Sequence, residues 1–222
     1  MRRSVGYTRE KGRQEAEKSL RRAIELDGGR PTTYNSYAFF CLLPYGRNEE
    51  AVQQLRLAEQ ADPSSPLIQF SLAYALTNSR KYEEAEKYLR KLPEDYPDRR
   101  AYLARVRLFR GKAAEVIQEL EPEYRSGVPS ASYIRSALGC AYAAAGRRAE
   151  AEEVARDSAL NPFNPAAIFA CLGDKDRSFE VLAVAVKAGA FRFGRAIHSP
   201  EYASLHGDPR LGALRKRAGL AD

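Results

Sequence analysis

The sequence predicts an all-α fold, a superhelix of about five helix pairs that ends in a C-terminal capping helix. Three residues recur at a fixed spacing of 34 positions: Ala51, Leu55 and Pro63 return as Ala85, Leu89 and Pro97. A period of this length is typical of helical repeat arrays. Apolar and small residues follow helical spacing along nearly the whole chain, and no alternating strand pattern occurs.

Glycine and proline mark the ends of the predicted helices. A first helix over 9–27 ends at Gly28 and Gly29, because glycine readily adopts the left-handed conformation found past helix C-termini. Five pairs follow, over 32–43 with 47–61, 65–78 with 81–95, 98–109 with 112–126, 130–145 with 147–160, and 164–172 with 174–188. The turns within these pairs are marked by Gly46, Arg80, Gly111, Gly146 and Gly173. The turns are spaced by 34, 31, 35 and 27 residues, so the period is strict only in the first half.

The C-terminal part of the chain lies outside the repeat. Residues 189–207 contain three glycines and a proline, and we expect them to be irregular. A last helix follows, with Asp208 as its N-cap, Pro209 as its first residue and Gly219 as its end. The predicted domains are therefore an array over 1–188 and a C-terminal region over 189–222. The expected units of the array lie near 9–30, 31–63, 64–97, 98–129, 130–162 and 163–188.

Composition limits the classes of function. Mean hydropathy is −0.51, and apolar runs such as 166–172 and 181–186 are far shorter than the about 20 residues that span a bilayer. We therefore expect a cytoplasmic protein without membrane insertion. The net charge of +7 is concentrated in 1–30 and 187–222 rather than along one stripe, so we do not expect nucleic acid as a partner.

The reactive residue types form no recognisable centre. Cys41, Cys140 and Cys171 are odd in number and make no CxxC pair, which argues against a disulfide framework or a zinc site. We expect three buried free thiols in a reducing compartment. His198 and His206 have no thiol nearby, so no metal site is expected. Without a nucleophile, base or phosphate-loop pattern, the sequence predicts no catalytic residue, no cofactor and no enzyme.

The units resemble tetratricopeptide repeats, whose pattern is roughly W-x2-L-G-x2-Y, then G, A-x3-F, A and P. The best copy contains Leu138, Gly139, Tyr142, Gly146 and Ala151. The small residues of this pattern lie where two antiparallel helices touch, and they let the backbones approach closely. The resemblance implies a right-handed superhelix that binds a protein or peptide ligand in its concave groove.

A second resemblance covers nearly the whole chain. Segments 15–27, 37–39, 61–68, 172–177 and 207–211 are similar to C-terminal repeat regions of bacterial multidomain signalling proteins. Those proteins carry winged-helix regulator, serine/threonine kinase or adenylate cyclase domains. The resemblance implies an alternative function, that of a sensor or regulatory domain which binds a small molecule or self-associates.

The N-terminal edge is the candidate surface for self-association. Gly12 lies 34 residues before Gly46, so the chain is predicted to open on the second helix of a unit, with the first helix absent or reduced to 2–8. Such an uncapped unit exposes an apolar edge, through which a homo-oligomer would form.

In this register the first helix of each pair lines the groove. The candidate partner-binding residues are Tyr37, Phe40, Phe70, Tyr74, Asn78, Tyr102, Arg105, Tyr133 and Ser136. Aromatic side chains beside an arginine are typical of protein-binding hot spots. We expect a non-enzymatic protein-interaction scaffold whose groove contains Phe70, Tyr74 and Arg105. Replacing Tyr74 and Arg105 by alanine should then abolish partner binding and leave the melting temperature nearly unchanged.

Overall fold

The computed structural model describes residues 3–127, 132–158 and 160–220, without the side chains of residues 3–11, 13, 132, 133, 188 and 190. All regular structure in these residues is helical, as the sequence predicts. The α-helices are α1 (Arg3–Leu26), α2 (Pro31–Tyr37), α3 (Asn48–Ala61), α4 (Pro66–Asn78), α5 (Tyr82–Lys91), α6 (Arg99–Phe109), α7 (Ala113–Arg125), α8 (Ser132–Ala144), α9 (Arg148–Asp157), α10 (Phe163–Cys171), α11 (Lys175–Ala185), α12 (Ala190–Ile197) and α13 (Pro209–Ala218). The shorter elements are a π-helix, η1 (Ala38–Leu42), and the 3₁₀ helices η2 (Leu43–Tyr45), η3 (Val186–Ala188) and η4 (Pro200–Leu205).

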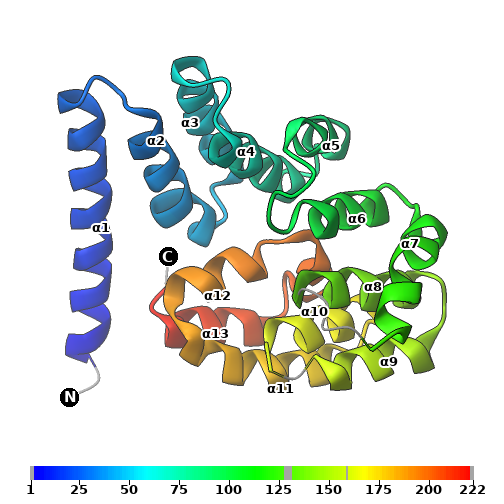
Figure 1. Cartoon of the computed structure of the whole chain (residues 1–222). Helices are drawn as coiled ribbons and strands as arrows, with labels where there is room; N and C mark the ends of the chain where they lie inside the picture. The colour runs from blue at the N-terminus through cyan, green and yellow to red at the C-terminus, as the bar shows by residue number, and fades with distance from the viewer. Residues whose placement is uncertain (1–2, 128–131, 159, 221–222) are drawn as a thin grey trace.

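Five helix pairs stack into a curved array, which confirms the predicted all-α superhelix (Figure 1). The pairs are α2 with α3, α4 with α5, α6 with α7, α8 with α9, and α10 with α11. The turns within them have positive φ angles, 75° at Gly46, 60° at Arg80, 81° at Gly111 and 74° at Gly146 and Gly173. A positive φ is readily available to glycine, which is why glycine marks four of these five turns in the sequence. The predicted unit boundary at 129–130 lies outside the described residues.

The first helix differs from the sequence prediction. Gly12 lies inside α1, a continuous helix over Arg3–Leu26, and neither a turn nor a separate helix over 2–8 forms among the described residues. One glycine inside an exposed helix costs about 1 kcal/mol, which the helix formers on both sides of it offset. The C-terminal half of α1 packs against α2, where the Glu17 carboxylate accepts hydrogen bonds from Tyr37 Oη and Arg47 Nη1.

The C-terminal region is the second difference. The predicted irregular segment 189–207 contains the helices α12 and η4, whose side chains at Phe193, Ile197 and Leu205 are fully buried. Helix α12 crosses the concave side of the array and packs against η2 in the first unit, below α2 in Figure 1. The C-terminal region thus joins the end of the array to its beginning.

Close backbone contact explains why Gly194 misleads sequence reasoning. A Cβ atom at this position would collide with the carbonyl oxygen of Pro44 and would lie 2.9 Å from Leu220 Cδ1. The glycine is therefore a packing requirement of α12 and does not break the helix. The capping helix α13 follows, and the Asp208 carboxylate accepts a hydrogen bond from the backbone N–H of Arg210 at 3.0 Å.

The contact between α12 and η2 can be tested with a pair of glycine substitutions. Gly194→Ala should lower the free energy of unfolding by about 1–3 kcal/mol, because the added methyl group overpacks the contact with Pro44. Gly212→Ala on α13 is the matched control, since a Cβ there meets open space. It should raise stability by about 0.5–1 kcal/mol through helix propensity. Urea unfolding measures the free energy of unfolding of both variants. The same change in Gly194→Ala and Gly212→Ala would contradict the packing of α12 against the first unit.

Candidate functional site

A cavity of about 220 Å³ lies where the C-terminal region crosses the concave side of the array. Its walls combine the first helices of the repeat pairs with α12 and η4. The lining residues that the sequence predicts are Phe70, Tyr74, Tyr102, Arg105 and Ser136. The register of the repeat places these residues together, because each lies on the first helix of a pair.

Aromatic rings form one wall of the cavity. Phe70 and Tyr74 are four residues apart on α4 and therefore lie on one face of that helix. Tyr102 on α6 meets Phe70 edge to face with ring centroids 4.8 Å apart, and its centroid lies 6.0 Å from that of Tyr74. Phe39 of η1 continues the wall, 5.7 Å from Tyr74. Rings that pack in this way form a rigid apolar surface.

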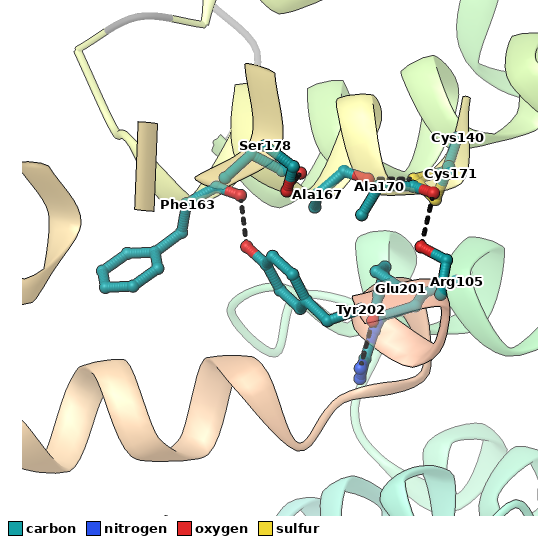
Figure 2. Close-up of a disulfide and its surroundings, with 11 residues drawn as sticks. Arg105, Cys140, Phe163, Ala167, Ala170, Cys171, Ser178, Glu201 and Tyr202 are labelled. Carbon is teal, nitrogen blue, oxygen red and sulfur yellow. Dashed lines mark hydrogen bonds and ion pairs between the residues drawn. A yellow bond between two sulfur atoms is a disulfide. The ribbon is translucent and has the colours of Figure 1, made fainter. Parts of the chain in front are cut away.

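A buried ion pair between Arg105 and Glu201 joins the array to the C-terminal region (Figure 2). The guanidinium binds the carboxylate through two hydrogen bonds, Nε to Oε1 and Nη2 to Oε2, the latter 2.9 Å long. The two residues are only 8% and 9% exposed. Burial opposes ionisation of Glu201, but the adjacent Arg105 outweighs it and holds the pKa of Glu201 below its ordinary value. Burial likewise opposes the charge on Arg105, and Glu201 nevertheless raises the pKa of Arg105.

Further contacts around this ion pair hold η4 and α12 against the array. Tyr202 Oη donates a hydrogen bond of 2.7 Å to the backbone oxygen of Phe163 at the start of α10 (Figure 2). Tyr74 Oη approaches the backbone oxygen of Arg195 at 3.4 Å. Asn78 is buried, and its Oδ1 lies 3.5 Å from Arg105 Nη2. Arg105 Nη1 is also buried and has no hydrogen-bond partner among the described residues.

The burial of Arg105 corrects one expectation from the sequence. Arg105 lines the cavity, but its charge is already paired with Glu201 inside the protein. Removing one member of a buried ion pair leaves the other charge uncompensated. An alanine at Arg105 would therefore affect stability as well as binding, contrary to the unchanged melting temperature expected above.

The remaining predicted groove residues lie elsewhere. Tyr37 is buried against α1, where its hydroxyl donates to Glu17 and accepts from Arg21 Nε. Phe40 is half exposed and meets Phe191 edge to face, outside the set of cavity-lining residues. Tyr133 belongs to α8, but its side chain lies outside the described part of the structure.

Sequence reasoning missed two cations that line the cavity, Arg192 and Arg195. They are three residues apart on α12, and their guanidinium carbons lie 5.2 Å from the ring centroids of Phe163 and Phe39, respectively. Arg192 Nη2 also donates to Asn161 Oδ1 at 3.2 Å. Neither arginine forms an ion pair with a carboxylate of the described residues. The sequence signal was a pair of arginines three apart beside aromatic residues in the basic C-terminal region.

The cysteines correct another expectation. Cys140 of α8 and Cys171 of α10 form a disulfide with their Cα atoms 5.4 Å apart, so they are not free thiols (Figure 2). They are 31 residues apart, close to one repeat, and neighbouring units bring such positions together. The bond removes one support for the predicted cytoplasmic location, since disulfides persist mainly in oxidising compartments. Cys41 is the buried free thiol, and its burial raises the pKa to about 11.

The described residues form neither a metal-binding cluster nor a membrane-spanning helix. They contain no group of three or more His, Cys, Asp and Glu side chains arranged to hold a metal ion. Within the same part of the chain, no helix has both the length and the apolar character of a membrane span.

The buried ion pair predicts a specific dependence of stability on pH. Glu201→Gln should lower the free energy of unfolding at pH 7 by about 3 kcal/mol, because it leaves Arg105 buried without a counter-charge. Since the folded pKa of Glu201 lies below the ordinary 4.5, its contribution is complete above that value and is lost as the pH falls through the folded pKa. The difference between variant and wild type should therefore shrink below about pH 4.

The matched control for this prediction is Glu115→Gln. Glu115 pairs with Lys112 on the surface, where their side chains are 57% and 41% exposed, respectively. This substitution should change stability by less than about 0.5 kcal/mol at any pH. Urea unfolding from pH 3 to 8 compares the two variants, and an effect of Glu201→Gln no larger than the control would contradict a stabilising pair.

The comparison with known families agrees with the repeat geometry. The family model described as tetratricopeptide repeat matches residues 42–108, from the end of η1 to the end of α6. No curated protein matches the chain. The matched segment coincides with stacked antiparallel helix pairs whose turns follow the repeat period. The chain therefore contains tetratricopeptide repeats within residues 42–108.

Proposed function

We propose that the protein is a non-catalytic interaction module that binds a short peptide segment of a partner protein at the cavity of its concave side. Tetratricopeptide repeats generally mediate protein–protein interactions, and they do so through extended concave surfaces. The observation that carries the proposal is the cavity itself, where Phe70, Tyr74 and Tyr102 present an aromatic wall.

The size of the cavity favours a short segment over a helix. Helix α12 and η4 occupy much of the concave side, and about 220 Å³ of cavity remains. This volume is below the about 300 Å³ at which small-molecule pockets begin. It therefore holds one or two side chains rather than a whole helix. A partner would therefore insert an anchoring side chain and lay its neighbouring residues over the rim.

Filling the cavity tests this proposal. Ser136→Trp introduces a large side chain at a half-buried lining position, and Gln118→Trp on the exposed face of α7 is the matched control. Cross-linking in cells at near-native expression should recover a protein partner with the wild type and with Gln118→Trp. With Ser136→Trp the yield should fall at least tenfold, while the melting temperature stays within a few degrees of the wild type. Equal recovery with all three proteins would exclude the cavity as the binding site.

A second candidate is a sensor that binds a small molecule, as the resemblance to signalling proteins implies. The C-terminal region encloses the groove, and this favours the sensor function, because concave, mostly apolar sites with a few polar groups suit small ligands. A thermal-shift screen with a metabolite panel distinguishes the two candidates. A ligand that stabilises the wild type but not Ser136→Trp would support the sensor.

Self-association through the N-terminal edge stays a prediction. Leu26 at the end of α1 is 69% exposed, which leaves an apolar side chain at that edge. Light scattering should then show a dimer that Leu26→Glu dissociates, and a strict monomer for the wild type would contradict it.

A further inference from the structure

We propose that the cavity binds a carboxylate carried on an apolar or aromatic body, and that Arg192 and Arg195 of α12 hold this carboxylate. The inference deepens the proposed function, because a Glu or Asp side chain beside an apolar residue of a partner peptide would present this chemistry. A small organic acid presents the same chemistry, and the experiment below distinguishes the two sources.

The charges around the cavity favour a single negative charge. Three arginines line it, and two carboxylates, Asp98 and Glu201, line it as well. Arg105 and Glu201 neutralise each other in the buried ion pair. Arg192 and Arg195 then face Asp98 alone, which leaves an excess of one positive charge. A monoanion such as a carboxylate would balance this charge, whereas a phosphate dianion would exceed it.

The two arginines of α12 are already held in place. Each guanidinium lies over an aromatic ring, Arg192 over Phe163 and Arg195 over Phe39. Stacking on a ring restrains a long side chain and leaves its edge open for hydrogen bonds, one of which Arg192 Nη2 already donates to Asn161 Oδ1. A carboxylate that binds such donors loses less side-chain entropy than one that binds flexible lysines.

A buried donor gives independent support. Arg105 lines the cavity and is 8% exposed, and its Nη1 has no acceptor among the described residues. Buried donors of folded proteins are nearly always paired. A ligand oxygen would pair this donor once the side chains that cover Nη1 shift aside, while Nε and Nη2 stay bound to Glu201. The aromatic wall of Phe70, Tyr74 and Tyr102 then faces the body of the ligand.

The first experiment compares an acid with its neutral amide. Calorimetric titration of the full chain uses 3-phenylpropanoate and 3-phenylpropanamide, which differ chiefly in charge. The peptide arm uses acetyl-Ala-Ala-Phe-Glu-Ala-amide, which carries one carboxylate, and the same peptide with Gln in place of Glu. The wild type should bind at least one of the acidic probes, with a Kd at least tenfold below that of its neutral counterpart. Equal affinity for charged and neutral probes, or no binding of either acid, would overturn the proposal.

A matched pair of double variants locates the charge. The double variant Arg192→Gln with Arg195→Gln should raise the Kd of the acidic probe at least tenfold. Arg156→Gln with Lys187→Gln removes the same net charge from exposed positions outside the cavity lining and should change the Kd by less than twofold. An equal loss in both double variants would show attraction by net charge alone and would contradict a site at α12.

The outcomes separate this inference from the proposed function. If the free acid binds and Ser136→Trp leaves the recovery of a cross-linked partner unchanged, the carboxylate site stands and the protein-binding function at the cavity fails. If Ser136→Trp abolishes partner recovery and neither acidic probe binds, the protein-binding function stands and the carboxylate site fails.

Discussion

The buried ion pair of Arg105 and Glu201 is the constraint on which the rest of this molecule depends. It joins α6, in the middle of the array, to η4, which is 96 residues away in the chain. Two charges leave water to form it, so the pair is stable only when its geometry satisfies both partners. The two parallel hydrogen bonds pair both carboxylate oxygens of Glu201 with Nε and Nη2 of Arg105, and they fix where the C-terminal region crosses the concave side. The hydrogen bond from Tyr202 to the backbone of Phe163 attaches the same region to α10. The close packing of Gly194 against Pro44 attaches it to the first unit.

This crossing changes what the repeat array offers to a ligand. Without it, the first helices of the pairs would line an open groove. With α12 and η4 in place, the groove becomes a cavity of about 220 Å³, lined partly by the repeats and partly by the C-terminal region. The repeats supply the aromatic wall, and α12 supplies the cations Arg192 and Arg195. Affinity for an apolar body and selectivity for charge thus come from different parts of the chain, so each can be altered without the other.

Local features were predictable from the sequence, and long-range ones were not. Gly46 and Gly146 marked their turns because a positive φ is a local requirement. Phe70, Tyr74 and Tyr102 could be placed on one side because the repeat period relates the first helices of neighbouring pairs. The partner of Arg105 could not be found, since Glu201 lies outside the repeat and no period relates the two. Gly194 indicated an irregular segment because its role is a contact with Pro44, which becomes visible only once the chain has folded.

Native-state hydrogen exchange tests most directly whether the C-terminal region is an integral part of the fold. The fully buried side chains of Phe193, Ile197 and Leu205 predict that the amides of α12 and η4 exchange only through global unfolding, together with those of α4 and α6. Their exchange free energies should then match the free energy of unfolding and fall with denaturant at the same slope. Exchange of α12 and η4 through a local opening, while α4 and α6 stay protected, would show that the C-terminal region does not close the groove.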